Sequence, residues 1–353
     1  VDFRRKNLMR DGDISPVGHV IPHIKSEEVL AKALKSSGYR RDKGKQVGRG
    51  VAMAQWLPLG GEGHAFVTVD AQGEIAVSTA MVDQGAGTYT AMRQIAANEL
   101  HVAVDRVRYE ILDTSRAAAD TGVGASRATR IFGNSVHAAA VQVKGNLLQA
   151  ASEILNVAKD HLAFTETASI RAINGRELTF SAIVKHLGAP IRCEGSYKNF
   201  ENGPAAALCV QVAEVKVDGE TGEVRLRQFT TVHSTGRIIN PLTHQGQIDG
   251  GVVMALGYAL MEQLWIDQGK VTTTNFGENK IPTMRDIPRL RTVVQEYPVG
   301  NGPYGGMSIG EPPVLVAAAA IANAVHDAVG VRIFDLPITA EKVLRAIGSL
   351  RKN

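Results

Sequence analysis

A nearly uninterrupted apolar run, residues 314–329, follows two adjacent prolines in the last part of the sequence. Proline is tolerated in the first turn of a helix, because its missing N–H has no partner to lose there. Pro312 and Pro313 therefore predict the start of a helix. Since the run is apolar on every face, the helix is expected to be buried, and the rest of the chain has to supply a core around it.

One carboxylate, Glu311, stands at the start of this predicted helix, directly after the glycine-rich stretch 305–310. A carboxylate at the mouth of a buried helix is poorly solvated and held in place, and both conditions favour a general base. The alternative is that Glu311 accepts hydrogen bonds from the free N–H groups at the helix start. From the spacing alone, both roles stay open.

Composition limits the class of partner. The chain has 353 residues, enough for one large domain or two. The net charge is +4, but the basic residues are scattered and aromatic residues make up only 5% of the chain. Because aromatic side chains do not alternate with basic ones, there is no platform for stacking bases, and we expect no nucleic acid partner. We also expect no membrane span, because we expect no apolar run of the sequence to be long enough to cross a bilayer.

The chain has two cysteines, Cys193 and Cys209, which excludes a disulfide framework and any zinc or iron–sulfur cluster held by this chain alone. Low cysteine content favours a reducing compartment, so we expect a cytoplasmic protein. Cys, His and carboxylate residues do not cluster at metal-ligand spacing, and no side chain is expected to bind a metal directly. The Gly-x-Ser-x-Gly and Walker motifs of serine hydrolases and P-loop proteins are absent.

Two hairpin–loop–helix units indicate an internal similarity. In the first, predicted strands at 65–69 and 75–78 lead to a glycine-bearing loop with Gln84 and then to a helix at 88–100. In the second, predicted strands at 210–217 and 224–232 lead to a loop that contains Gln247, and an apolar helix follows. The pattern predicts an α+β fold with two similar lobes of mixed β-sheet and helices that face one site.

The predicted organisation has three parts. Residues 1–45 are read as an extension with one helix at 27–35, residues 46–190 as the first lobe, and residues 191–353 as the second lobe, which carries Glu311. The extension has no evident core of its own, so we expect it to lie against a separate polypeptide.

Small residues open a long predicted helix at 126–162, after the segment Thr121-Gly122-Val123-Gly124-Ala125-Ser126-Arg127. Such residues let backbone amides at a helix N-terminus approach an anion, although close helix packing explains them equally well. Glutamine offers a donor and an acceptor without charge. Gln84, Gln247 and exposed amides near Gly124 together suit a large, flat, heteroatom-rich and phosphorylated ligand.

These segments resemble the xanthine dehydrogenase/oxidase family of molybdenum hydroxylases. Gly310-Glu311-Pro312-Pro313 before an alanine-rich helix resembles the active-site segment of that family. Its three cofactor loops are similar to Gln84-Gly85 with Gly87-Thr88, to Gly124-Ala125-Ser126-Arg127, and to Asn240-Pro241 with Gly246-Gln247. The match covers nearly all 353 residues in the family's order.

The resemblance implies a molybdopterin-binding fold, with the cofactor as its cytosine dinucleotide and molybdenum held by the pterin dithiolene. It implies that Glu311 is the base that deprotonates the hydroxyl ligand of the metal, and that the reaction oxidises an electron-poor carbon of an N-heterocycle or aldehyde with water as oxygen source. The residues implied at the cofactor are Gln84, Gly85 and Gln247 as pterin contacts, Gly124 and Ala125 close to the metal centre, and Ser126 and Arg127 at phosphate.

The resemblance also implies partners. The chain corresponds to the C-terminal half of the usual molybdenum subunit, so another chain is expected to carry the N-terminal half. 2Fe-2S clusters and FAD are expected on iron–sulfur and flavin subunits, and the substrate is a small molecule. Asp83 departs from the glycine that usually precedes the first glutamine. The alternative function is a non-catalytic assembly or cofactor-insertion subunit that keeps the fold.

Overall fold

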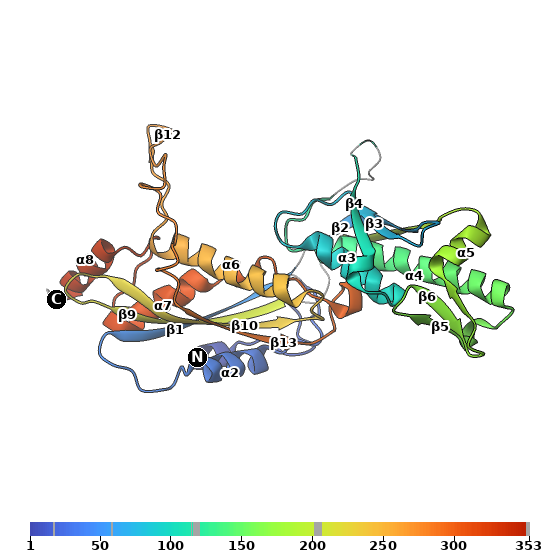
Figure 1. Ribbon diagram of the computed structural model, residues 1–353. Coiled ribbons are helices and arrows are strands. Elements are labelled where there is room, and N and C mark those ends of the chain that lie inside the picture. The colour runs from blue at the N-terminus through green and yellow to red at the C-terminus, as the bar shows by residue number, and fades with distance from the viewer. Residues whose placement is uncertain (17, 58, 114, 116–120, 201–206, 351–353) are drawn as a thin grey trace.

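Two four-stranded sheets, each covered by helices, divide the molecule into two lobes that lie side by side (Figure 1). The computed structural model describes residues 1–16, 18–57, 59–113, 115, 121–200 and 207–350. The first lobe is built on the sheet β4-β3-β2-β8 and the second on the sheet β1-β9-β10-β13. The predicted α+β class with two lobes of mixed sheet and helices is confirmed.

The first lobe packs two long helices against one face of its sheet. The strands are β2 (Gly61–Val69), β3 (Ile75–Thr79), β4 (Val107–Ile111) and β8 (Ile191–Asn199), and the helices are α3 (Thr88–Leu100) and α4 (Ala128–Leu155). Helix α4 lies across β2 and β8 (Figure 1), and α3 packs on α4. A small sheet of β5 (Leu162–Thr165), β6 (Ser169–Ala172) and β7 (Glu177–Thr179), with α5 (Phe180–Leu187), closes the far end of α4.

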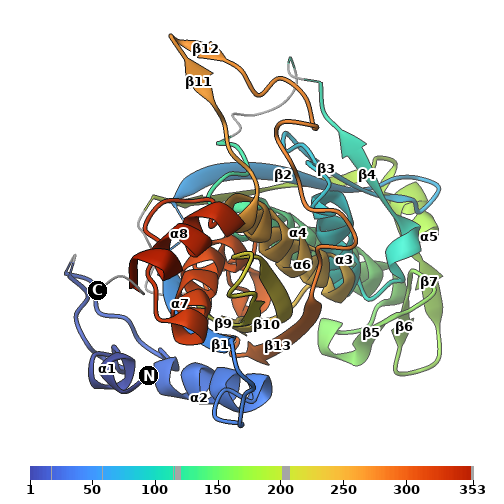
Figure 2. The same ribbon diagram turned by 90° about the vertical axis from the view of Figure 1, so that its left-hand side faces the viewer.

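The second lobe has helices on both faces of its sheet. The strands are β1 (Val47–Trp56), β9 (Ala207–Val217), β10 (Val224–Thr235) and β13 (Arg289–Glu296). Helices α6 (Pro241–Leu260), α7 (Ala317–Val329) and α8 (Ala340–Leu350) lie on one side, and α2 (Ser26–Ser37) lies on the other (Figure 2). The short helix α1 (Asp2–Lys6) and the two-residue strands β11 (Ile266–Asp267) and β12 (Lys270–Val271) complete the described α-helices and strands. Four short 3-10 helices lie at Val104–Arg106, Lys159–His161, Pro303–Gly305 and Pro312–Val314.

Helix α7 lies unusually close to β1 because small residues face each other. A Cβ atom at Gly48 would be 2.0 Å from the carbonyl oxygen of Ala324, and one at Gly50 would be 2.1 Å from that of Ala320. Glycine is therefore required in the strand, and alanine in the helix leaves room for the approach. This contact explains the alanine-rich composition of the apolar run. One face of α7 is buried in the lobe core and Ala319 on another face is exposed, so the expected burial on every face is confirmed only in part.

Residues Pro312–Val329 correct one expectation from the sequence. By length and composition this segment is apolar enough to cross a membrane, which the sequence analysis did not recognise, and no other described segment meets the same test. The chain instead packs α7 on β1 and β9, with Ala317, Ile321 and Val325 fully or almost fully buried. That is the position of a helix in a protein core.

The N-terminal extension does have a core to rest on, so the premise that it lacks one was wrong, whereas its contact with a separate polypeptide stays a prediction. Val29, Leu30 and Ala33 of α2 are fully buried against the apolar side chains of β9 and β10. The strand β9 is buried along nearly its whole length, which is typical of a strand covered on both faces. The sheet therefore needs α2 as its second cover.

The sheets do not follow the predicted boundaries at residues 46 and 190. Strand β1 lies within the predicted first lobe, 46–190, but pairs with β9 of the second sheet, while β8 lies within the predicted second lobe, 191–353, but pairs with β2 of the first. Each lobe therefore takes one strand from across the predicted boundary.

The predicted ranges of single helices agree with the structure to different degrees. The range of α3 is confirmed. Helix α4 ends at Leu155 rather than at residue 162, because Asn156 adopts a left-handed conformation with φ 50°. Helix α5 was not predicted.

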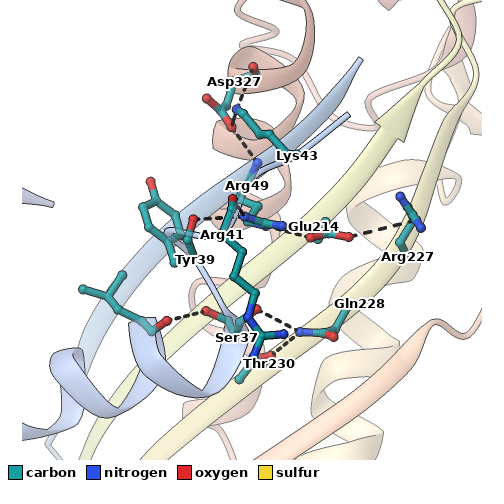
Figure 3. A network of polar contacts seen from close by, with 11 residues as sticks. Ser37, Tyr39, Arg41, Lys43, Arg49, Glu214, Arg227, Gln228, Thr230 and Asp327 are labelled. Atoms are coloured by element: carbon teal, nitrogen blue, oxygen red, sulfur yellow. Dashed lines mark hydrogen bonds and ion pairs between the residues drawn. The ribbon is translucent and has the colours of Figure 1, made fainter. Parts of the chain in front are cut away.

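Arg49 on β1 connects the N-terminal extension to both the sheet and α7 (Figure 3). Its guanidinium donates to Glu214 Oε2 at 2.7 Å and to the backbone carbonyls of Tyr39 and Arg41. Its backbone N–H donates to Asp327 Oδ2 at 2.7 Å, and Asp327 also pairs with Lys43. Because the Arg49 side chain is only 10% exposed, removal of its charge would leave a poorly solvated carboxylate at Glu214.

We therefore predict that Arg49→Met lowers the free energy of unfolding by about 3 kcal/mol, the usual cost of removing one member of a buried ion pair. Urea unfolding followed by circular dichroism measures the change. The matched control is Arg225→Met, which breaks the exposed pair with Glu223 and should leave the midpoint unchanged. Equal midpoints for the two variants would contradict the assigned role of Arg49.

Candidate functional site

A cavity of about 320 Å³ lies where the two lobes meet. The first lobe contributes the loop before α3 and the start of α4, and the second lobe contributes the start of α6 and the segment that ends at Glu311. Backbone amides, amide side chains and hydroxyl groups share the wall with apolar side chains. Cavities of this size with a few convergent polar groups are the usual form of a ligand site.

Glu311 is held at the wall by Ser126 of the first lobe. Ser126 Oγ donates to Glu311 Oε2 at 2.7 Å and accepts from the Glu311 backbone N–H at 2.8 Å. The Glu311 side chain makes no capping hydrogen bond to the short helix Pro312–Val314 that it precedes. Of the two roles that the sequence left open, the structure therefore disfavours capping and shows a positioned carboxylate.

The loop that carries Ser126 adopts an unusual backbone conformation. Ala125 and Ser126 have φ angles of 59° and 56°, in the left-handed region that residues with a Cβ seldom occupy. Such conformations persist only where the surroundings fix them. Trp56 Nε1 donates to the carbonyl of Ala125 at 3.4 Å, and Ser308 Oγ donates to the carbonyl of Ser126 at 3.0 Å, so contacts from the second lobe fix this loop.

Arg127 lies behind the same loop and does not line the cavity. Its guanidinium donates to the carbonyl oxygens of Gly60, Thr121 and Gly122. The Arg127 side chain therefore holds the loop in place from the side that faces away from the cavity. Arg130, one turn further along α4, lines the cavity instead, and burial lowers the pKa of its guanidinium.

The first glutamine loop is folded around Asp83. The Asp83 carboxylate accepts from the backbone N–H groups of Gly85, Gly87 and Tyr89 at 2.9 to 3.4 Å. The amides at the N-terminus of α3 thus already have a carboxylate partner within the chain. Gln84 is exposed and lines the cavity, whereas Gly85 does not line it.

Gln247 lies on a helix, which corrects the expectation that it lies in a loop. Asn240 caps α6 by accepting from the Thr243 N–H at 3.2 Å, and the helix begins at Pro241. Gln247 is therefore in the second turn, and His244 and Thr243, one turn earlier, line the cavity with it. Residues three or four apart share one face of a helix, and this spacing was the available signal for a role of His244 that the sequence analysis missed.

The hydroxyl oxygen of Thr88 and Nε2 of His244 lie on the cavity wall, and neither atom has a hydrogen-bond partner among the described residues. Burial lowers the pKa of His244 to about 4, so the imidazole is neutral near pH 7. Unpaired buried polar groups are rare in proteins, and a polar ligand in the cavity would satisfy both.

The wall fits a pterin cofactor. Such a ring system presents both donors and acceptors, and the amide groups of Gln84 and Gln247, the neutral His244 and the Thr88 hydroxyl offer both in return. A Cβ atom at Gly124 would meet nothing within 4 Å, so the backbone there is open to close approach. Within the described ranges, no three His, Cys, Asp or Glu side chains form a metal-binding group.

Comparison with known proteins finds similarity over most of the chain. The sequence profile of the family described as molybdopterin cofactor-binding domain matches residues 26–288. The xanthine dehydrogenase molybdenum-binding subunit of Escherichia coli is 31% identical over 97% of this chain and 49% of its own length. The gamma subunit of the 6-hydroxypseudooxynicotine dehydrogenase complex of Paenarthrobacter nicotinovorans is 28% identical over 99% of this chain and 48% of its own length.

The fold comparison agrees with the sequence comparison. The crystal structure of quinoline 2-oxidoreductase from Pseudomonas putida superimposes with a TM-score of 0.88 and 25% identity, over 98% of this chain and 49% of that one. This chain therefore spans about half the length of the relatives that it matches.

The buried neutral state of His244 predicts how stability depends on pH. The folded pKa of about 4 lies below the value of 6.5 for an exposed histidine, so between these values the unfolded chain binds a proton that the folded chain does not. The free energy of unfolding should therefore fall as the pH is lowered from about 7 to about 4, with His244 contributing on the order of 3 kcal/mol.

Urea unfolding at a series of pH values tests this assignment with the chain free of ligand. His244→Gln should reduce the pH dependence relative to the parent, whereas His186→Gln, at an exposed position on α5, should leave it intact. A pH dependence that is the same in His244→Gln and in the parent would show that His244 is not buried as a neutral group.

Proposed function

The chain belongs to the molybdopterin cofactor-binding domain family, and on that premise we propose that it is the catalytic half of the molybdenum-binding part of a multi-subunit hydroxylase. This membership confirms the resemblance drawn from the motifs. The proposed reaction oxidises an electron-poor carbon of an N-heterocycle or aldehyde, with water as the oxygen source. The observation that carries the proposal is the Glu311 carboxylate, held by Ser126 at the wall of a cavity lined by Gln84 and Gln247.

Glu311 is assigned as the base. The cofactor, when bound, supplies the two-electron redox chemistry of molybdenum. Ser126 occupies Oε2 with a hydrogen bond, so we assign Oε1 as the atom that takes the proton at the start of the reaction. The serine hydroxyl stabilises the charged form of the carboxylate and keeps it from turning away from the cavity.

The remaining site residues are assigned to cofactor binding. Gln84 and Gln247 are proposed to bond the heteroatoms of the pterin from opposite lobes, and Gly124 and Ala125 to let the cofactor approach the backbone. Gly85 contributes through the shape of its loop. Arg127 and Ser126 act through the loop that they hold, and Arg130 on the cavity wall is better placed than Arg127 to face a phosphate.

Partner chains complete the proposed enzyme. An iron–sulfur cluster is usually held by four cysteines, and this chain has two, both buried as free thiols. We therefore place the 2Fe-2S clusters and FAD on iron–sulfur and flavin subunits, and we retain the cytosine dinucleotide form of the cofactor as part of the proposal. The free thiols also support a cytoplasmic location.

A polypeptide equivalent to the other half of the relatives is proposed to cover the exposed face of α6. Leu242, Gly246, Gly250 and Met254 are spaced four residues apart and so share one side of this helix. Leu242 and Met254 are 82% and 62% exposed, and a Cβ atom at either glycine would meet nothing within 4 Å. An apolar helix face with glycine at its centre lets another chain pack closely. Gln247 lies beside this face, so its occupant would also lie next to the cavity.

The segment 262–288, which follows α6, forms an arm that also exposes apolar side chains. The arm projects away from both lobes (Figures 1 and 2). Its exposed apolar side chains include Trp265, Phe276 and Met284, at 57%, 76% and 90% exposure. A two-stranded arm with this much apolar surface is marginal in water by itself, which supports a partner of similar apolar character.

Glu311→Gln in the purified complex should reduce turnover by about 10²–10⁴-fold, the usual cost of losing a positioned base, with molybdenum content unchanged. Reduction of a dye with N-heterocycles and aldehydes measures turnover, and mass spectrometry measures molybdenum. Glu110→Gln, at an exposed carboxylate on β4, is the control. A Glu311→Gln complex as active as this control would overturn the assignment of the base and would favour a non-catalytic subunit.

Gly250→Leu should block assembly without damage to the chain itself. Leucine favours a helix over glycine, and a Cβ atom at this exposed position meets nothing within 4 Å, so thermal stability should be kept or slightly raised. Tagged chains purified from their own cells, followed by mass spectrometry of bound partners, should show at least a tenfold loss of the chain that matches the other half of the relatives, the effect of about 1.4 kcal/mol in binding. Gly145→Leu, at an exposed glycine on α4 that is equally open, is the matched control, and equal recovery by both variants would exclude α6 as the docking face.

A further inference from the structure

A layer of buried polar side chains lies in the second lobe on one face of the β9–β10 pair. Gln211 on β9 is directly opposite Thr231 on β10, and Cys209 is directly opposite His233. Alternate residues of a strand point to the same face, so all four share it. Their exposed fractions are between 0% and 2%, and the layer is therefore inaccessible to solvent.

Gln211 joins this layer to the helical turn Pro312–Val314 that follows Glu311. Gln211 Nε2 donates to the carbonyl of Pro313 at 2.7 Å and to Thr231 Oγ1 at 3.2 Å. A backbone carbonyl can only accept, so the orientation of the Gln211 amide is fixed. The Thr231 hydroxyl, which accepts from Gln211, is also hydrogen-bonded to His233 Nε2 at 2.7 Å. The bonds therefore link His233 through Thr231 and Gln211 to the Pro313 carbonyl.

His233 is the buried end of this network. Complete burial lowers the pKa of His233 to about 3, so the ring is neutral near pH 7 and shares one hydrogen bond with the Thr231 hydroxyl through Nε2. The two N–H groups of the Gln211 amide are donated to the Pro313 carbonyl and to Thr231.

This buried polar network would lower the stability of the fold if its only role were to fill the core. Gln211 Oε1 and His233 Nδ1 have no hydrogen-bond partner among the described residues, although both are buried. The next pair on the same face, Ala213 and Phe229, is apolar and fully buried. An apolar layer therefore fits this sheet, and the polar residues are restricted to the part that contacts the turn after Glu311.

The turn Pro312–Val314 has few other backbone groups that can form hydrogen bonds with the sheet. Pro312 and Pro313 have no backbone N–H, so their carbonyl oxygens are the only backbone groups that can form hydrogen bonds. Val314 N–H donates back to the Glu311 carbonyl at 3.0 Å, and its own carbonyl accepts from the Tyr258 hydroxyl at 2.8 Å. The bond from Gln211 therefore joins the sheet to the backbone next to Glu311.

We propose that Gln211, oriented by Thr231 and His233, is a positioning residue that holds the turn after Glu311 from the second lobe while Ser126 holds the carboxylate from the first. The inference rests on the proposed function of Glu311 as a base. A base held from only one side would sample positions from which proton transfer is slow, since a misplacement of about 1 Å can cost as much as 10²-fold in rate.

Gln211→Met and Thr231→Val test the proposal in the purified complex. Methionine keeps the length of the side chain without a donor, and valine keeps the shape of threonine without a hydroxyl. Thr230→Val is the matched control, since Thr230 is adjacent, fully buried and on the opposite face, where its hydroxyl accepts from Gln228. Melting temperatures and molybdenum content are compared first, so that the rate effects are read from equally folded and loaded proteins.

Hydrogen exchange at the backbone amides of Glu311 and Val314 is the first readout, and it does not depend on activity. Exchange should be on the order of tenfold faster in Gln211→Met and Thr231→Val than in Thr230→Val. Exchange equal to that of Thr230→Val in both variants would overturn the proposal.

Turnover is the second readout. We expect kcat to fall about tenfold or more in Gln211→Met, with KM within twofold of the parent and molybdenum content unchanged. A loss of activity that follows loss of molybdenum would assign the network a structural role and overturn the proposal. If the parent complex itself has no turnover, the proposed function fails, and hydrogen exchange alone then decides whether Gln211 holds the turn.

Discussion

The reciprocal pair of hydrogen bonds between Ser126 and Glu311 joins the two lobes at the cavity. One hydroxyl group donates to the carboxylate and accepts from the backbone of the same residue, so the position and the rotation of Glu311 are both restricted. The bond requires Ser126 in a left-handed conformation, which Arg127, Trp56 and Ser308 maintain through the surrounding carbonyls. The loop of the first lobe and the base of the second are thus parts of one structure.

The position of Glu311 depends in turn on how α7 packs. Gly48 and Gly50 let the helix backbone lie against β1, and this close contact fixes the height of α7 above the sheet. The turn Pro312–Val314 then lies directly over the polar part of β9 and β10, where Gln211 reaches the Pro313 carbonyl. A side chain larger than hydrogen at either glycine would move the helix and the turn together.

The sheet of the second lobe and the outer side of α6 differ in how completely they are covered. The sheet is covered by α2 on one side and by α6 and α7 on the other, and its central strand β9 is buried along nearly its whole length. By contrast, α6 leaves Leu242 and Met254 exposed on the side away from the sheet, and the arm beyond it exposes large apolar side chains. The relatives are about twice as long as this chain. The proposed partner, equivalent to the other half of the relatives, would cover this exposed apolar surface.

The sequence by itself determined the features that depend on neighbouring residues. Prolines 312 and 313 mark the start of a helical region, the range of α3 follows from its periodicity, and the motifs around Gln84, Gln247 and Glu311 identify the family. Only the tertiary structure decided which distant groups meet. Ser126 is 185 residues from Glu311, β1 and β8 each pair across the predicted lobe boundary, and α2 packs on the chain's own sheet. Local patterns record the preference of a segment for a helix or strand, whereas hydrogen bonds such as those of Ser126 depend on the closure of the whole chain, which leaves no periodic signal in the sequence.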